Sequence, residues 1–202
     1  MGGPSGGCIP STLGNTQVDY EQINQTGAIM GSGGMIVMDD ATCMVEMARF
    51  FLEFTQNESC GKCTSCRIGT LRMLEILQRI VEGKGKEGDL DTLLDLGRQI
   101  SSTSLCGLGQ TAPNPVITTI KYFREEYEAH IRDKKCPAHS CPALVKYVID
   151  PKKCIGCALC ARDCPVQAIT GERRQKHTIS DEKCVKCGKC VTVCNFDAVL
   201  KE

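Results

Sequence analysis

The sequence predicts an α+β fold in which helices and strands occupy different parts of the chain. Residues 41–131 carry apolar side chains at helical spacing, which is typical of a small helical bundle. Residues 147–202 contain two similar halves offset by thirty residues, and each half has the pattern of a short strand, a cysteine-rich loop and a short helix. Residues 132–146 separate these parts and are expected to form a linker that contains cysteine and histidine.

The two C-terminal halves share one cysteine spacing, C-x2-C-x2-C-x3-C. Thiolates are soft ligands that hold iron–sulfur clusters, and this spacing resembles that of bacterial two-cluster ferredoxins, in which the fourth cysteine of each run binds the cluster of the other run. A pair of structural zinc sites is the alternative, although zinc motifs usually pair two C-x2-C units across a longer gap. The polar hairpin that ends at His177 is expected to be a solvated turn. The ferredoxin resemblance implies one 4Fe–4S cluster on Cys154, Cys157, Cys160 and Cys194, and another on Cys184, Cys187, Cys190 and Cys164.

The composition favours a protein stabilised by bound metal. The 202 residues include 16 cysteines, no tryptophan and only 4% aromatic residues, so we expect clusters to replace part of the missing apolar packing. A secreted disulfide scaffold is the competing explanation, but the chain shows no signal peptide and its cysteines are grouped at metal-ligand spacing. We therefore expect a reducing, cytoplasmic location. The formal net charge of zero and the lack of a long apolar run argue against nucleic-acid binding and a membrane span.

Four helices are predicted between residues 41 and 131. Their apolar positions recur every three or four residues, and polar caps, glycine or proline mark their ends. The predicted start and stop signals are Asp40 or Thr42 for the first helix, Gly83 after the second, Asp89 for the third, and Asn114 followed by Pro115 for the fourth, which extends to about Ile131.

A third cysteine run precedes the second predicted helix and consists of Cys60, Cys63 and Cys66. A 4Fe–4S cluster needs a fourth ligand, and Cys106, in a loop bounded by glycine, is the candidate. A compact four-helix arrangement would bring it beside the other three. A buried free thiol is the alternative for Cys106. Arg67, next to the run, is expected either to neutralise the negative charge of the cluster or to face solvent.

Three long motifs together resemble a known family. They are Glu58-Ser-Cys-Gly-Lys-Cys63, Ser104-Leu-Cys-Gly-Leu-Gly-Gln-Thr-Ala-Pro-Asn-Pro115 and Phe123-Arg-Glu-Glu-Tyr-Glu-Ala-His-Ile131. The chain is similar to the NADH-binding flavoprotein subunit of respiratory complex I and, more closely, to the beta subunit of NADH-dependent electron-bifurcating iron hydrogenases. The resemblance implies a truncated β-grasp remnant at residues 1–40, a four-helix iron–sulfur domain at 41–131 and a two-cluster ferredoxin-like domain at 147–202.

That family binds FMN and NADH in an N-terminal domain that has no counterpart in this sequence. We therefore predict no catalytic residue and expect FMN and NADH on another domain or chain. The resemblance implies an electron relay between that flavin and free ferredoxin or a partner subunit, inside a multi-subunit complex of hydrogenase or NADH dehydrogenase type. Formate dehydrogenase complexes use similar subunits. A stand-alone soluble polyferredoxin is the second hypothesis, and a metal-stabilised binding module without a redox role is the third.

Four cysteines remain outside the three predicted clusters: Cys8, Cys43, Cys136 and Cys141. Mixed cysteine and histidine ligands at close spacing suit zinc. We predict a zinc site on His130, Cys136 and Cys141, with a flexible linker carrying reduced thiols as the alternative. The candidates for a fourth ligand are His139, Cys8 and Cys43.

Overall fold

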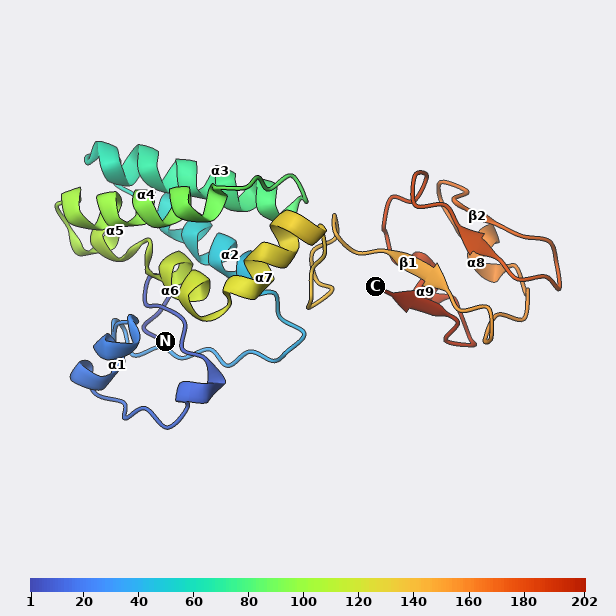
Figure 1. Ribbon diagram of the computed structural model, residues 1–202, viewed down its shortest axis with the longest axis horizontal. Helices are drawn as coiled ribbons and strands as arrows, with labels where there is room; N and C mark the ends of the chain where they lie inside the picture. Colours follow the sequence, from blue (N-terminus) through green and yellow to red (C-terminus); the bar gives the residue numbers. More distant parts are fainter. The chain divides into compact units, whose positions relative to one another are not determined.

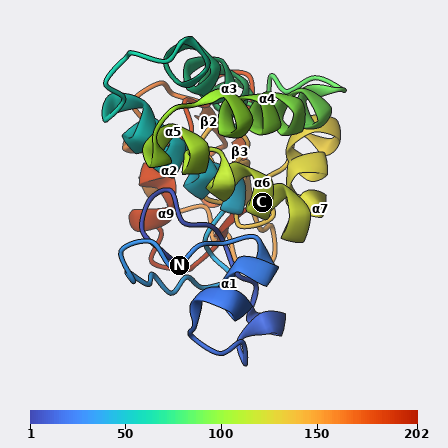
Figure 2. The same cartoon turned by 90° about the vertical axis from the view of Figure 1, so that its left-hand side faces the viewer.

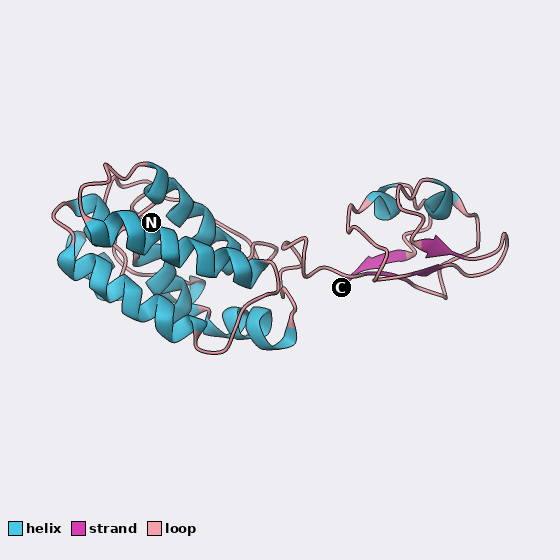
Figure 3. Ribbon diagram, turned by 90° about the horizontal axis from the view of Figure 1, so that it is seen from above, coloured by secondary structure: helices cyan, strands magenta, loops and turns pink.

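The computed structural model describes residues 1–202 and divides into two compact units, Met1–Cys141 and Pro142–Glu202. The first unit contains the long helices and the second contains all the strands (Figures 1 and 3). The predicted combination of helices with a small amount of sheet is therefore confirmed. The division falls inside the segment 132–146 that was expected to be a linker. None of the helices combines the length and the apolar character needed to cross a bilayer.

Four helices form the body of the first unit: α2 (Met44–Asn57), α3 (Thr70–Val81), α4 (Asp89–Thr103) and α6 (Asn114–Tyr122). Their apolar stripes meet in one core, where Leu52, Leu77 and Leu93 are fully buried. Figures 1 and 2 both show α3 and α4 side by side. An ion pair between Arg79 and the buried Asp89 joins the end of α3 to the start of α4. Shorter elements complete the unit: the π-helical turns η2 (Ser65–Gly69) and η3 (Ala129–Asp133), and the helices α5 (Gly107–Thr111) and α7 (Arg124–Glu128).

The fourth predicted helix is not continuous, and that part of the prediction is wrong. Phe123 has φ −130° and ψ 35°, outside the helical region, and it separates α6 from α7. After the break, α7 buries a single residue, Tyr127. Gly83, which follows α3, has φ 76°, as its predicted role as a helix stop requires.

The predicted caps are shifted by a few residues. The N-cap of α2 is Cys43 rather than Asp40 or Thr42, and no side chain of its own turn caps it. Instead the Met44 N–H donates to a carboxylate oxygen of Glu126, 3.0 Å away, on α7. Similarly, α4 begins after Gly88 with Asp89 inside the helix, and α6 begins after Pro113 with Asn114 inside it.

Residues 1–40 contain a single turn of 3-10 helix, η1 (Ser11–Leu13), and the helix α1 (Tyr20–Thr26), and no strand. The predicted β-grasp remnant is therefore not confirmed. The segment packs on α6 through polar contacts, because the Cys8 N–H donates to the Thr118 hydroxyl at 2.8 Å and the Tyr122 hydroxyl donates to the Thr26 carbonyl at 2.6 Å. Side chains of α6 therefore satisfy two of the backbone groups of this segment.

The second unit consists of two interlocked halves, as the sequence repeat predicts. Strand β1 (Tyr147–Ile149) pairs antiparallel with β4 (Val199–Lys201), and β2 (Ile169–Thr170) pairs antiparallel with β3 (Thr178–Ile179). Each ribbon therefore joins the start of one half to the end of the other. The short helices α8 (Leu159–Arg162) and α9 (Lys189–Thr192) lie on the same side of the strands (Figure 3). Ile149, Ile169 and Val199 are buried between the strands and the cysteine loops.

Candidate metal centres

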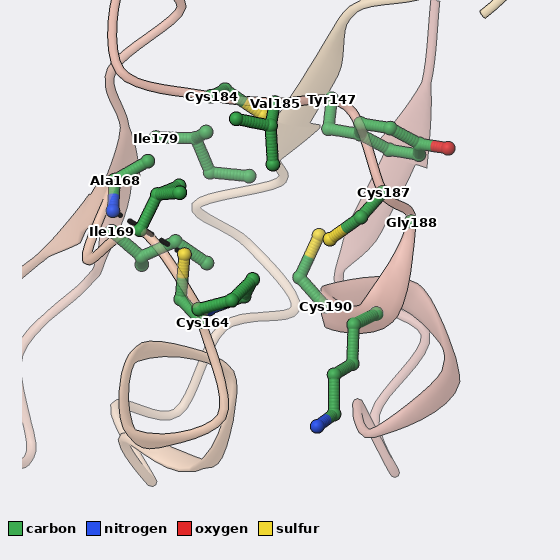
Figure 4. Close-up of a pocket in the computed structure, with 13 residues that line it drawn as sticks. Tyr147, Cys164, Ala168, Ile169, Ile179, Cys184, Val185, Cys187, Gly188 and Cys190 are labelled. Carbon is green, nitrogen blue, oxygen red and sulfur yellow. Dashed lines mark hydrogen bonds between the residues drawn. The ribbon is translucent and has the colours of Figure 1, made fainter.

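Two hollows in the second unit are each lined by four cysteines. The first hollow is lined by apolar side chains, by His177 and by the cysteines Cys154, Cys157, Cys160 and Cys194. The second is lined by apolar side chains, by Tyr147 and by the cysteines Cys164, Cys184, Cys187 and Cys190 (Figure 4). These are the two sets that the ferredoxin resemblance assigned to the two clusters. In both hollows the fourth cysteine comes from the other half, because the antiparallel ribbons bring the end of each half beside the start of the other.

The backbone of the second unit supports a cluster in each hollow. The Ala168 N–H donates to Cys164 Sγ at 3.3 Å, and the Ala198 N–H donates to Cys194 Sγ at 3.4 Å. The two donors occupy equivalent positions in the repeat, so both crossing cysteines receive the same hydrogen bond. Such N–H groups stabilise the negative charge of thiolate sulfur and influence the reduction potential of a bound cluster. Apolar walls, four sulfurs and N–H donors in each hollow fit a 4Fe–4S cluster.

Burial affects how readily these thiols ionise. It raises the pKa of Cys160, and it raises the pKa of Cys190 to about 11, with the nearby Cys184 adding to the effect. Metal ligation requires the thiolate form, so these thiols must release protons when a cluster binds. Bound iron would supply the positive charge that makes this ionisation favourable.

The helical unit places its predicted cluster cysteines on adjacent elements. Cys66 is buried in η2, whereas Cys106 is the exposed N-cap of α5. Gly109 of α5 faces Cys66 of η2, because a Cβ atom added there would lie 2.6 Å from the Ser104 side chain and 3.3 Å from Cys66 Cβ. Cys60 and Cys63 lie in the short segment that precedes η2. A glycine at position 109 is thus needed for the close approach of the Cys106 segment to Cys66.

Polar groups near Cys66 fit a bound cluster. The Ser59 hydroxyl lies 3.4 Å from Cys66 Sγ. The buried Ser104 hydroxyl, packed against Gly109, has no hydrogen-bond partner within the protein. A buried donor without a partner costs free energy, and a cluster sulfur would supply the missing acceptor. Arg67 is exposed to solvent, as one of its two predicted roles requires, and its guanidinium donates to the Gly61 carbonyl inside the cysteine run.

A fourth centre brings together Cys43, His130, Cys136 and Cys141, whose ligand atoms all lie within 4.8 Å of one another. The distance from Cys43 Sγ to His130 Nε2 is 3.4 Å, from His130 Nε2 to Cys141 Sγ 3.4 Å, and from Cys141 Sγ to Cys43 Sγ 3.6 Å. A tetrahedral zinc ion, with bonds of about 2.3 Å to sulfur and about 2.0 Å to nitrogen, would hold two sulfurs about 3.8 Å apart and a sulfur and a nitrogen about 3.5 Å apart. The arrangement therefore fits a single tetrahedral ion.

The surroundings of His130 suit a metal ligand. Its Nδ1–H donates to the Glu126 carbonyl at 2.7 Å, which leaves the lone pair of Nε2 directed at the three sulfurs. Burial lowers the pKa of His130, but its hydrogen bonds with Cys136 and Cys43 outweigh this and raise the pKa to about 10. Hydrogen bonds from Cys141 and Cys43 lower the pKa of Cys136 well below that of an ordinary thiol. The group of sulfurs thus stabilises a positive charge at the place that a metal cation would take.

Of the three candidates for a fourth ligand, the structure places one close to His130, Cys136 and Cys141. Cys43 lies in the group, whereas His139 is exposed and Cys8 contacts α6 instead. Cys43 comes from the start of α2, far from the other three in sequence, and no local spacing indicates it. The only sequence signal was its status as a cysteine left over from the three cluster sets.

Comparisons with known proteins agree with iron–sulfur binding in both units. Residues 46–130 match the NADH-ubiquinone oxidoreductase-F iron-sulfur binding region, and residues 147–201 match a 4Fe-4S dicluster domain. Both matched segments are iron–sulfur binding regions. The NADP-reducing hydrogenase subunit HndC of Solidesulfovibrio fructosivorans is 58% identical over 201 residues, which is 100% of this chain and 41% of HndC.

Two further relatives extend the comparison to other complexes. The F 2 subunit of the NADH-quinone oxidoreductase of Rhizobium meliloti is 40% identical over 68% of this chain and 33% of its own length. The crystal structure of an NAD+-reducing [NiFe]-hydrogenase in the H2-reduced state superimposes with a TM-score of 0.55 and 31% identity, covering 65% of this chain and 22% of the hydrogenase chain. The chain thus spans less than half the length of these relatives, and the part that it shares with them is an iron–sulfur region.

Proposed function

We propose that this chain is the iron–sulfur electron-relay segment of an NAD(P)H-linked oxidoreductase complex of hydrogenase or NADH dehydrogenase type. The observation that carries the proposal is the presence, in one chain, of the F-type iron–sulfur region and a dicluster domain with two four-cysteine hollows. Each 4Fe–4S cluster, when bound, transfers one electron at a time. The protein's contribution is to hold the clusters, set their potentials and exclude water from their sulfurs.

The ligands of the relay follow from the three cysteine sets. The helical cluster uses Cys60, Cys63, Cys66 and Cys106, and the two clusters of the second unit use the cysteines that line the two hollows. Electrons pass between a flavin carried by another domain or chain and either free ferredoxin or a partner subunit. FMN and NADH bind on that other part, and catalysis of hydride transfer takes place there. A reducing compartment such as the cytoplasm suits the many free thiols.

A structural zinc ion on Cys43, His130, Cys136 and Cys141 completes the cofactor set. The close distances between the four ligand atoms support zinc over a cluster, because a 4Fe–4S cube holds its cysteine sulfurs further apart than a single ion does. The ion ties the segment around residues 136–141 to the start of α2 and to η3, and it has no redox role. In this proposal residues 1–40 are the rearranged end of a β-grasp domain.

A stand-alone polyferredoxin is the second candidate, favoured by the likeness of the second unit to a dicluster domain. The two proposals differ in the helical cluster, because a simple carrier has no need of a third cluster on a helical domain.

The test is an anaerobic titration with dithionite, followed by visible absorbance and EPR. The relay predicts reversible bleaching with about three electrons taken up per chain, one for each cluster. The variant Cys66→Ala is expected to take up about two electrons, while Cys8→Ala, a control outside every set, still takes up three. Uptake of two electrons by both the unmodified chain and Cys66→Ala would support the carrier instead. No bleaching at all would contradict both proposals.

A further inference from the structure

Two buried side-chain atoms of the chain have no hydrogen-bond partner, the Ser104 hydroxyl and Nε2 of His177. His177 is 2% exposed, contrary to its prediction as a solvated turn residue. Its Nδ1 lies 3.1 Å from the Gln175 carbonyl, so the neutral ring carries its proton on Nδ1, and Nε2 is an acceptor. The Ser104 hydroxyl differs, because it always carries a proton that it can donate. A buried donor without a partner indicates an acceptor that the protein itself does not supply.

Ser104 lies beside the cysteines of the helical cluster. It follows α4, precedes Cys106 by two residues and is 5% exposed. A Cβ atom added at Gly109 would lie 2.6 Å from Ser104 Oγ and 3.3 Å from Cys66 Cβ, so the serine and the cysteine flank the same glycine. The Gln110 side chain donates to the Ser104 carbonyl at 3.1 Å and holds the backbone there. The unpartnered hydroxyl is therefore fixed near a buried cysteine of the cluster site.

The cluster sites of the two units obtain their hydrogen-bond donors differently. In the second unit, backbone N–H groups donate to the Sγ atoms of Cys164, Cys184 and Cys194. In the helical unit no backbone N–H donates to a cysteine sulfur of the cluster site, and the one polar contact is the Ser59 hydroxyl, 3.4 Å from Cys66 Sγ. Side-chain hydroxyls are therefore the donors that the helical site offers to a cluster, and that of Ser104 is the one still without an acceptor.

We propose that the Ser104 hydroxyl donates a hydrogen bond to a sulfur of the helical cluster and raises the reduction potential of that cluster. The sulfurs of a bound cluster can only accept, so the hydroxyl is the donor, and it needs no change of protonation state to act. The reduced cluster is one charge more negative than the oxidised one, so a donated hydrogen bond stabilises the reduced form more. This inference rests on the proposed function, because it needs a cluster in the helical unit.

The test is an EPR-monitored redox titration of the full chain, in which the step that disappears in Cys66→Ala belongs to the helical cluster. Ser104→Ala removes only the hydroxyl, and we expect the potential of that step to fall while the other two steps stay unchanged. A tenfold weaker preference for the reduced form corresponds to a fall of about 59 mV. The matched control is Ser102→Ala, because the exposed Ser102 hydroxyl donates to the Gln99 carbonyl, and this variant should shift no potential.

Iron and sulfide contents separate the possible failures. If Ser104→Ala keeps the iron content of the unmodified chain and shifts no potential, or shifts all three alike, the inference about Ser104 is overturned while the relay stands. If Ser104→Ala loses iron, Ser104→Cys replaces it, because its thiol is similar in shape and a weaker donor. A lower potential of the helical cluster in Ser104→Cys would support the inference, and an unchanged potential or loss of the cluster in this variant too would overturn it. If the unmodified chain shows no step that Cys66→Ala removes, the proposed function itself fails.

Discussion

The four-ligand centre of the helical unit and the hollows of the second unit use the same residue type in two different ways. At Cys43, His130, Cys136 and Cys141 the ligand atoms converge within 4.8 Å, which suits one tetrahedral ion. In the hollows the cysteines surround an apolar space that also admits backbone N–H donors. The difference shows that cysteine content alone does not define a metal site: the separation of the sulfurs and the groups between them determine whether an ion or a cluster fits.

The largest effect is expected from removing a ligand of the proposed zinc ion. In Cys43→Ala or His130→Ala the chain should lose zinc and keep its iron. The free energy of unfolding of the helical unit should fall by several kcal/mol. Structural zinc contributes about 10–16 kcal/mol in small zinc domains, and the loss is expected to be a part of that. Zinc analysis and thermal unfolding measure both quantities. Cys8→Ala is the matched control, because Cys8 lies outside the group. Retention of zinc in both ligand variants would mean that these four residues do not form a zinc site, and the contrast with the cluster hollows would be wrong.

The next effect tests whether the fourth cysteine of each run binds the cluster of the other run. Cys194→Ala should lose one cluster, or about four iron, because it leaves the first hollow incomplete. Combining it with Cys154→Ala, from the same hollow, should cost no further iron, whereas combining it with Cys184→Ala should cost about eight iron in total. The opposite pattern, with the larger loss in the first combination, would mean that each run holds its own cluster without crossing.

The smallest effect tests what positions the zinc ligands. The Glu126 side chain caps α2 at Met44, but its backbone carbonyl is what orients His130. Glu126→Ala should therefore lower the stability of the helical unit by about 1 kcal/mol, the usual cost of a lost N-cap, and leave the zinc content unchanged. Glu125→Ala, one residue away and exposed, is the control and should change neither. Loss of zinc in Glu126→Ala would show that the carboxylate has a direct part in the site.

The sequence predicted those features that depend on local spacing. The thirty-residue repeat predicted the strand, loop and helix of each half, and the apolar periodicity predicted α2, α3 and α4. The features that were missed depend on contacts between distant residues. Glu126 caps a helix that begins 82 residues earlier, and the break at Phe123 follows no glycine or proline. His177 is in a polar segment, and only the closure of its hairpin on Gly156 buries it.

The most direct test of the whole account is the content of iron, acid-labile sulfide and zinc per chain after strictly anaerobic purification. Three 4Fe–4S clusters and one four-coordinate ion predict about twelve iron, about twelve sulfide and about one zinc. Zinc without sulfide would contradict the relay and would mean that the cysteine sets hold structural ions only.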